Sequence, residues 1–337
     1  MVDLIYIEEE VAEHPRTHAI RARFPKATTV SIERYGEVFN RAGQNFRLQK
    51  QRPSLILARK HGQRVLPTPE GYGIGGQRNF YFSHMLNCPY DCRYCFLQGM
   101  FRSAAYVVFV DYEDVFEAVA ATVRESESED SWFFSGYDCD SLAFEGVTGF
   151  VDAALPVFAA QERAWLELRT KSVRIEPLRR HEPFERCVVA FSLTPEATSR
   201  ALEQGVPSVE RRLRALVEVA ERGWPIGLRF DPLIYVEGFE SHYRGLFDAV
   251  FEQLDPAAVH SVSLGPFRLP TGFFRKIEKL HPDAPLFAGP FEDRGGMTSY
   301  HRQLEADLVG FVTQELARRV PEDRFFPCPL PDGEVAA

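Results

Sequence analysis

Three cysteines lie close enough together to form one metal site. Cys88, Cys92 and Cys95 are spaced C-x3-C-x2-C within eight residues of the chain. Three thiolates on one tight loop can each bind a different iron of a four-iron cluster, which leaves the fourth iron without a protein ligand. Because an iron with an open position can bind a reactant, the spacing favours an iron–sulfur cluster with a chemical role.

Zinc is the alternative metal for this loop. Structural zinc takes four ligands in a closed tetrahedron, usually from two close pairs of cysteines or histidines. Only three cysteines are close together here, so Cys139 or His84 would have to supply the fourth ligand. A zinc site would indicate a non-catalytic nucleic-acid-binding protein, which is the competing hypothesis from another functional class.

The composition bounds the class of protein. The chain has 337 residues, 45% hydrophobic and 26% charged, with a formal net charge of −9. These values fit one large or two modest globular domains and exclude fibrous or wholly disordered chains. No apolar run approaches the roughly 18 residues of a membrane span, and the first ten residues carry acids where a signal peptide would be basic. We therefore expect a cytoplasmic protein with reduced thiols and no membrane contact.

The cysteine loop must be positioned by the elements around it. From about residue 79, six short β-rich runs alternate with helical patterns, which indicates a parallel α/β sheet or barrel. The runs are Asn79–Met85, Trp132–Ser135, Trp165–Thr170, Cys187–Leu193, Ile226–Phe230 and His260–Leu264. Helices are expected at 113–124, 148–161, 196–203, 243–253 and 301–318, and a further helix is expected to start near Pro207 and Ser208 and to stop at Gly223.

In such folds, reactive groups follow the carboxyl ends of strands. On this assignment Cys88, Cys139, Lys171 and Ser192 all lie there. Residues 1–78 lack the alternation and are expected to form an N-terminal region packed on a barrel of residues 79–318, followed by a tail of residues 319–337.

The cysteine motif and several other segments resemble a known family. C-x3-C-x2-C with an aromatic residue before the last cysteine is the signature of radical S-adenosylmethionine (SAM) enzymes. The segment Cys88-Pro-Tyr-Asp-Cys92-Arg-Tyr-Cys95-Phe-Leu-Gln98 resembles the spore photoproduct lyase family in particular. The resemblance also includes Leu4–Glu8, Thr170-Lys171, Phe191-Ser192-Leu193 and Glu203-Gln-Gly205, so it covers most of the chain.

This resemblance implies a fold, two cofactors and a reaction. The fold would be a partial (β/α)6 TIM-like radical SAM barrel with an N-terminal α/β extension. A 4Fe-4S cluster would bind SAM and cleave it to a 5′-deoxyadenosyl radical. The radical would remove a hydrogen from C6 of spore photoproduct (5-thyminyl-5,6-dihydrothymine) in UV-damaged DNA, which then reverts to two thymines. A flavodoxin- or ferredoxin-type reductant is implied, and no obligate protein partner is evident.

The resemblance also implies roles for single residues. Cys139 matches the cysteine that returns a hydrogen to the thymine radical, and Asp138 and Asp140 beside it would disfavour its thiolate. Lys171 and Ser192 match SAM-contacting residues, and Ser141 matches a serine two places after the donor cysteine. Cys187 and Cys328 are interpreted as non-catalytic.

The match is incomplete next to the last cluster cysteine. The family has a tyrosine on each side of that cysteine, and both are thought to relay the radical back to SAM. Here Tyr94 is kept, but the second position is Phe96, which has no O–H to pass on. If the relay operates, the enzyme either uses another hydrogen donor, such as Tyr137 beside Cys139, or consumes SAM in each turnover. The difference also favours an alternative substrate, such as another nucleic acid lesion or a modified nucleoside.

Contact with DNA requires cations and stacking aromatics. A lesion has to leave the duplex to reach a barrel interior. Seven Lys or Arg and no acid lie between Arg41 and Arg64, and an ordinary solvated face explains that stretch equally well. The other candidates for contact are Arg268, Arg275, Lys276, Arg294, Tyr235 and Tyr300.

Overall fold

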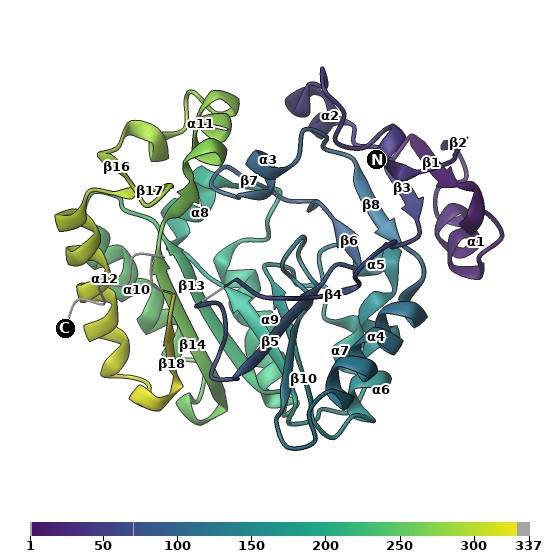
Figure 1. Cartoon of the computed structure of the whole chain (residues 1–337). Coiled ribbons are helices and arrows are strands. Elements are labelled where there is room, and N and C mark those ends of the chain that lie inside the picture. Colours follow the sequence, from purple (N-terminus) through teal and green to yellow (C-terminus); the bar gives the residue numbers. More distant parts are fainter. Residues whose placement is uncertain (1, 70, 329–337) are drawn as a thin grey trace.

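A curled sheet forms the centre of the molecule (Figure 1). The computed structural model describes residues 2–69 and 71–328. Eight strands run in the order β18-β14-β13-β11-β10-β9-β5-β4, and all pair in parallel except β4 with β5. Their bounds are β18 Phe325–Pro327, β14 Val259–Pro266, β13 Ile226–Leu233, β11 Cys187–Ser192, β10 Ala164–Thr170, β9 Ser131–Phe134, β5 Arg78–Phe82 and β4 Val65–Pro67. This half-barrel confirms the predicted α/β, partial TIM-like fold.

The central strands are apolar on both faces. All six residues of β11 are buried, because helices cover one face and the barrel interior the other. Each of the six predicted β-rich runs forms a strand in this sheet. The edge strands β4 and β18 were missed, since three residues are too few to show a period.

Helices cover the outside of the half-barrel (Figure 1). They are α4 Tyr112–Arg124, α6 Phe150–Ala159, α7 Glu176–Arg180, α8 Glu196–Leu202, α9 Val209–Glu221, α10 Phe239–Phe251 and α12 Arg302–Ala317. Helix α9 begins where Ser208 accepts a hydrogen bond from the Arg211 N–H, and it buries Leu213 and Leu216. The single helix expected at 148–161 is wrong in one respect: Gly149, with φ of 59°, separates it into α5 (Glu145–Thr148) and α6.

A second sheet contains most of the N-terminal region. Its order is β2-β1-β3-β8-β6, with bounds β2 Thr28–Ile32, β1 Leu4–Glu8, β3 Leu55–Ala58, β8 Tyr106–Phe109 and β6 Met85–Leu86, and α1 (Pro15–Ala22) packs beside it. The two sheets do not separate at residue 78. Strand β4 precedes that point but joins the half-barrel, whereas β6 and β8 follow it and join the N-terminal sheet. Likewise β18, from the expected tail, joins the half-barrel.

Short elements surround the upper opening of the half-barrel in Figure 1. They are α2 Phe46–Gln51, β7 Asp91–Cys92, α3 Leu97–Met100, β12 Glu203–Gln204, β15 Arg268–Pro270, α11 Thr271–Leu280, β16 Phe291–Arg294 and β17 Met297–Tyr300. This is the end at which the parallel strands terminate, so side chains from distant parts of the chain meet there. Within the described residues, no helix has the length and apolar character needed to cross a membrane.

Candidate active site

The cysteine loop follows β6 and is shaped by protein contacts. Asn87 precedes it with φ of 69°, in the left-handed region that asparagine tolerates better than most residues. The Asn87 side-chain amide donates hydrogen bonds of 2.8 Å to two backbone carbonyl oxygens. In the middle of the loop β7 pairs with β12, which sets Cys92 opposite Glu203. These contacts with the rest of the protein give the loop a defined shape.

The spacing of the three sulfur atoms bears on the choice between an iron–sulfur cluster and zinc. In a tetrahedral site with Zn–S bonds near 2.3 Å, two sulfurs lie roughly 3.8 Å apart. Over residues 2–69 and 71–328, the one group of three or more potential ligands whose atoms all lie within 4.8 Å of one another is Glu8, Glu10 and His61. The three cysteines are spread more widely, and neither Cys139 nor His84 completes a zinc site with them. A larger cluster, in which each thiolate binds its own iron, does not need the sulfurs to approach so closely.

Burial affects the protonation of these three thiols. Burial raises the pKa of Cys88 to about 12, and the pKa values of Cys92 and Cys95 are raised by burial as well. Thiolates at this position therefore need positive charge nearby, and metal ions supply it by displacing the protons. The residues present fit a 4Fe-4S cluster held by three cysteines.

A cavity of about 510 Å³ opens beside the cysteine loop. Eight of the nine predicted site residues line it: Cys88, Cys92, Tyr94, Cys95, Phe96, Cys139, Lys171 and Ser192. Ser141 is the exception, because its hydroxyl is buried and lies 2.9 Å from the hydroxyl of Ser135. The predicted role of Ser141 therefore has no contact with the cavity to support it.

Cys139 lies on a loop that packs directly against β10. A Cβ at Gly136 would lie 3.0 Å from the backbone oxygen of Arg169, so a larger residue there would push the two segments slightly apart. The Cys139 sulfur lies 3.7 Å from the carbonyl oxygen of Ser135 and 3.8 and 3.9 Å from the two ring nitrogens of His84. Burial raises the pKa of Cys139 well above its usual value, and nearby negative charges add to this. The group is therefore a protonated thiol, as expected from the sequence.

Asp140 connects the Cys139 loop to the end of β10. Its carboxylate accepts hydrogen bonds of 2.6 Å from the Thr170 hydroxyl and from the Lys171 backbone N–H. The Lys171 ammonium lies 5.6 Å from the centre of the Tyr94 ring and makes no hydrogen bond with the part of the chain that the structure describes. This cation is thus held at the cavity wall beside the cysteine loop.

The hydroxyl of Tyr94 has a buried partner. It donates a hydrogen bond to the carboxylate of Glu203, which forms a 2.6 Å ion pair with Arg212. Both charged side chains of this pair are fully buried, and Ser199 also donates to Glu203. The pair therefore fixes the cysteine loop through Tyr94. The sequence did not indicate this role, because Arg212 lies on α9, far from the cysteine motif along the chain.

Another tyrosine lies next to Phe96. The ring centres of Phe96 and Tyr137 are 5.7 Å apart, and Tyr137 also stacks on Tyr81 at 4.3 Å. Both Phe96 and Tyr137 line the cavity. A phenolic hydroxyl is thus available close to the position where the second tyrosine of the motif is missing.

Sequence reasoning missed two charged residues of the cavity, Arg169 and Asp231, and assigned a third cavity residue, Cys328, to the tail. Arg169 and Asp231 line the cavity together with Arg268, which had been expected to contact DNA. Asp231 directly follows the predicted strand 226–230, so the rule about strand ends contained the signal. Cys328, interpreted as a tail residue, also lines the cavity.

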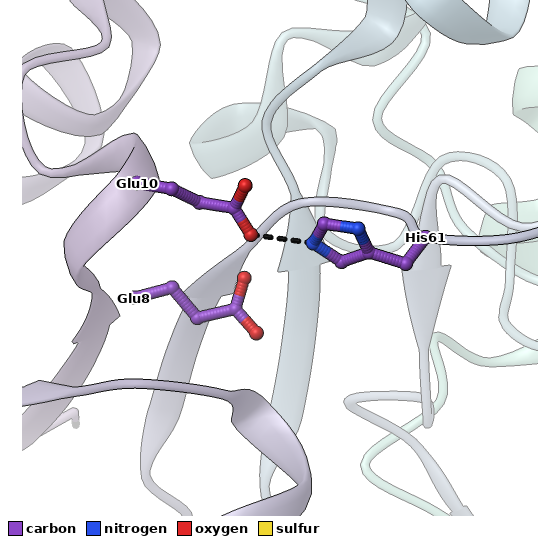
Figure 2. A group of neighbouring side chains, drawn as sticks. All are labelled: Glu8, Glu10 and His61. Atoms are coloured by element: carbon purple, nitrogen blue, oxygen red, sulfur yellow. Dashed lines mark hydrogen bonds and ion pairs between the residues drawn. The ribbon is translucent and has the colours of Figure 1, made fainter.

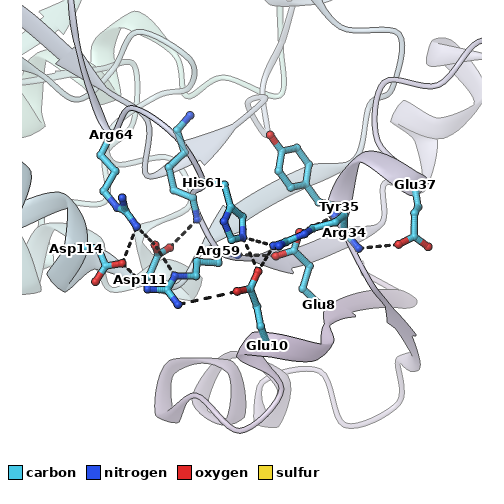
Figure 3. Close-up of polar contacts among 11 residues, drawn as sticks. Glu8, Glu10, Arg34, Tyr35, Glu37, Arg59, His61, Arg64, Asp111 and Asp114 are labelled. Atoms are coloured by element: carbon cyan, nitrogen blue, oxygen red, sulfur yellow. Dashed lines mark hydrogen bonds and ion pairs between the residues drawn. The ribbon is translucent and has the colours of Figure 1, made fainter.

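Most of the basic stretch 41–64 is neutralised by carboxylates from elsewhere in the chain. Figure 3 shows Arg59 and Arg64, which bind Asp114 at 2.8 and 2.7 Å. Outside that view, Arg47 binds Asp91 at 2.8 Å. The expectation of an open cationic surface is therefore not met by these residues.

The remaining DNA-contact candidates are dispersed. Arg275 is exposed and pairs with Asp293 at 3.6 Å, whereas Lys276 donates to the Gly99 carbonyl oxygen at 3.0 Å. Arg294 pairs with Glu305. Tyr300 is buried and accepts a hydrogen bond from the Tyr235 N–H, so it packs in the core and does not wedge between bases.

A second ligand-like group, Glu8, Glu10 and His61, lies in the N-terminal region (Figure 2). The carboxylate of Glu8 is buried and accepts backbone hydrogen bonds from Tyr35 at 2.6 Å and Arg59 at 2.9 Å. Glu10 and His61 contact each other, and the guanidinium of Arg34 contacts both. The donor atoms are therefore already engaged. We call the following residues the N-terminal polar network: Glu8, Glu10, Arg34, Arg59, His61, Arg64, Asp111 and Asp114.

Comparison with known proteins gives a consistent result. The family model described as spore photoproduct lyase matches residues 81–282. The spore photoproduct lyase of Bacillus subtilis (strain 168) is 24% identical over 291 residues, which cover 84% of this chain and 83% of that protein. That of Geobacillus sp. (strain Y412MC61) is 25% identical over 202 residues, 59% of each chain.

Solved structures resemble the whole chain. A spore photoproduct lyase mutant with bound AdoMet and dinucleoside spore photoproduct superposes with a TM-score of 0.82 at 19% identity, covering 98% of this chain and 99% of that one. A second structure, a spore photoproduct lyase complexed with dinucleoside spore photoproduct, gives 0.81 at 18% identity and covers 98% of both chains. These likenesses support the fold.

Proposed function

The chain belongs to the spore photoproduct lyase family, and we propose that it is a radical SAM DNA repair lyase that reverses spore photoproduct to two thymines. Membership makes it a spore photoproduct lyase-like enzyme, and the proposal concerns the lesion and the residues that act on it. The observation that carries the proposal is that Cys139, a protonated thiol, and the three-cysteine loop line one cavity.

Each cavity residue has a separate task in this proposal. Cys88, Cys92 and Cys95 hold the 4Fe-4S cluster, and Lys171 and Ser192 orient SAM, with the ammonium of Lys171 facing its carboxylate. When bound, the cluster and SAM supply a 5′-deoxyadenosyl radical. Cys139 then breaks its S–H bond homolytically, the hydrogen atom passes to the substrate carbon radical, and a thiyl radical remains on sulfur.

The thiyl radical must regain one hydrogen atom before the next turnover. We assign this step to Tyr137, whose phenol lines the same cavity beside Phe96. The O–H hydrogen passes to the sulfur, and the tyrosyl radical takes a hydrogen atom from 5′-deoxyadenosine. The hydroxyl of Tyr94 is engaged with Glu203, which makes it the less available donor.

The proposed partners follow from the same chemistry. The substrate is UV-damaged DNA, whose lesion leaves the stack to enter the cavity, and a flavodoxin- or ferredoxin-type protein supplies the electron. Two solved neighbours hold dinucleoside spore photoproduct, which supports a lesion of this size. The expected location is the cytoplasm.

The first test combines two products in one assay. The protein is reconstituted anaerobically with iron and sulfide, reduced with dithionite, and incubated with SAM and dinucleotide spore photoproduct. We expect thymidylyl-thymidine to form, with much less than one 5′-deoxyadenosine per repair if Tyr137 returns the hydrogen. One 5′-deoxyadenosine per repair would instead mean that SAM is consumed.

A matched pair of cysteine variants tests the donor. Cys139→Ala should still cleave SAM but should divert the thymine radical to adducts or slow quenching, because no thiol remains to supply the hydrogen. Cys187→Ala removes a buried thiol that does not line the cavity, so its repair yield should equal that of the wild type. Unchanged repair by Cys139→Ala would exclude the assigned role.

A second candidate function is favoured by Phe96. A radical SAM enzyme that acts on another nucleic acid lesion or a modified nucleoside would need no second tyrosine to recycle SAM. In that case the assay above would give 5′-deoxyadenosine without repaired dinucleotide.

A further inference from the structure

Two arginines share one carboxylate in the wall of the cavity. Arg268 Nη1 donates to Asp231 Oδ1 at 2.9 Å, and Arg169 Nη2 donates to the Asp231 backbone oxygen at 2.8 Å and lies 3.8 Å from Oδ2. The three side chains are 18%, 20% and 13% exposed for Arg268, Arg169 and Asp231, and all line the cavity. We call them the Arg169–Asp231–Arg268 triad.

The guanidinium of Arg268 retains free donors. Nη1 is used by Asp231 and by the Pro266 carbonyl oxygen, whereas Nε and Nη2 make no hydrogen bond with residues 2–69 or 71–328. The backbone is shaped around this group, because a Cβ at Gly265 would lie 2.7 Å from Nη1. The side chain is thus held in place with N–H groups left over for a ligand.

The charges of the triad do not balance. Burial alone would raise the pKa of Asp231, but Arg268 and Arg169 outweigh it and lower that pKa, so the carboxylate is ionised. Two guanidinium charges against one carboxylate leave one positive charge. An uncompensated charge in a largely enclosed wall is costly unless an anion joins it.

The wall beside Arg268 is apolar. Phe267, Leu269 and Phe273 line the same cavity, as does Met297 of β17. A ligand complementary to this wall has a flat apolar surface and one negative charge. Two bases joined by a phosphodiester have both features.

We infer that the Arg169–Asp231–Arg268 triad is the subsite that binds the single negative charge of the phosphodiester between the two nucleosides of the lesion. The inference rests on the proposed function and assigns the residues that hold this phosphate. Asp231 binds both arginines and neutralises one of their two positive charges, so the triad keeps a net charge of one. Arg guanidinium groups bind phosphate oxygens through charge-assisted hydrogen bonds.

The test compares ligands with and without the phosphate. Binding of dinucleotide spore photoproduct and of dinucleoside spore photoproduct to the reconstituted protein with SAM is measured anaerobically without reductant, so that no turnover occurs. The wild type should bind the phosphate-containing form about tenfold more tightly or better, and Arg268→Gln should remove that preference while leaving the dinucleoside affinity within about twofold. Asp231→Asn should strengthen the preference, because a second guanidinium charge is freed.

Controls separate the subsite from general effects. Arg214→Gln changes an exposed arginine of α9 that does not line the cavity, and it should leave both affinities unchanged. Equal weakening of both ligands by Arg268→Gln would show a structural role and overturn the inference. So would weakened SAM binding with an unchanged preference for the dinucleotide, because the anion held there would then be the carboxylate of SAM.

Failure of the proposed function gives a different pattern. If neither form of spore photoproduct binds the wild type, the lesion is wrong, and undamaged thymidylyl-thymidine and thymidine are used as probes in the same variants. A phosphate-dependent preference that Arg268→Gln removes would support the subsite for another dinucleotide substrate. The absence of any such preference would overturn the inference.

Discussion

Arginines have opposite charge balances in two regions of this molecule. In the N-terminal polar network, three arginines meet four carboxylates, and most of these charges are paired within the network (Figure 3). In the cavity, Arg169 and Arg268 share Asp231 alone. The first arrangement holds segments of the N-terminal region together, whereas the second leaves a charge for a ligand. The difference shows that the number of arginines alone does not predict the charge available to a ligand. The number of carboxylates packed against those arginines must be counted as well.

The two regions also contrast as ligand sites. The Glu8, Glu10 and His61 group has compact geometry (Figure 2), but backbone N–H groups and Arg34 already occupy its ligand atoms. The cysteine loop carries three thiols that line the cavity, at the spacing of a cluster held by three thiolates. Metal binding is therefore expected at the cysteines only.

Of the substitutions that test this contrast, Cys88→Ala should cause the largest loss, namely of the cluster and of SAM cleavage. With two thiolates left, the cluster should be lost, and 5′-deoxyadenosine formation should fall to background because SAM has no iron to bind. Iron and sulfide content and SAM cleavage measure this. Glu10→Gln in the compact group should retain full iron, and a loss of iron there would contradict the contrast.

Arg212→Met should have the next largest effect. It leaves Glu203 buried without its cationic partner, which typically costs about 3–5 kcal/mol of unfolding free energy. Urea denaturation of the reconstituted protein measures the loss. Combining Arg212→Met with Glu203→Gln removes the uncompensated charge and should recover part of the stability; if it recovers none, the charge is not the cause.

His84→Leu should change the response to acid. Burial lowers the pKa of His84 to about 3, below its ordinary value near 6.5. The unfolded chain therefore takes up a proton at this site first, so the contribution of neutral His84 is full above pH 6.5 and is lost as the pH falls towards 3. Between pH 6.5 and 4.5, wild-type stability should fall by about 2 kcal/mol more than that of His84→Leu. Parallel pH profiles from urea denaturation would contradict the shift.

Arg59→Gln should have the smallest effect. This side chain is 43% exposed and pairs with Asp114 at 2.8 Å, so its loss should cost about 1 kcal/mol or less, and less still at high salt. Thermal unfolding at two salt concentrations measures the change. Dinucleotide binding should be unaffected; weaker binding would place a ligand contact in the N-terminal polar network and end the contrast between the two regions.

Much of the fold followed from local patterns. The six central strands are apolar and regularly spaced, and Ser208 and Gly223 bracket α9, so their positions are encoded within short windows. The division between the sheets was not encoded in this way. Strands β4, β6 and β18 have two or three residues each, and only tertiary pairing assigns them to a sheet.

The sequence by itself determined the metal-binding loop, because its three ligands lie within eight residues and their spacing alone indicates which metal site they can form. It also placed Cys139, Lys171 and Ser192 at strand ends that share one edge of a parallel sheet. Only the tertiary structure decided the charge of the cavity and the partner of Tyr94. Arg169 and Arg268 meet Asp231 from 62 and 37 residues away, and Tyr94 meets Glu203 across 109. Charge balance and hydrogen bonding depend on distances in space, which the order of residues along the chain does not contain.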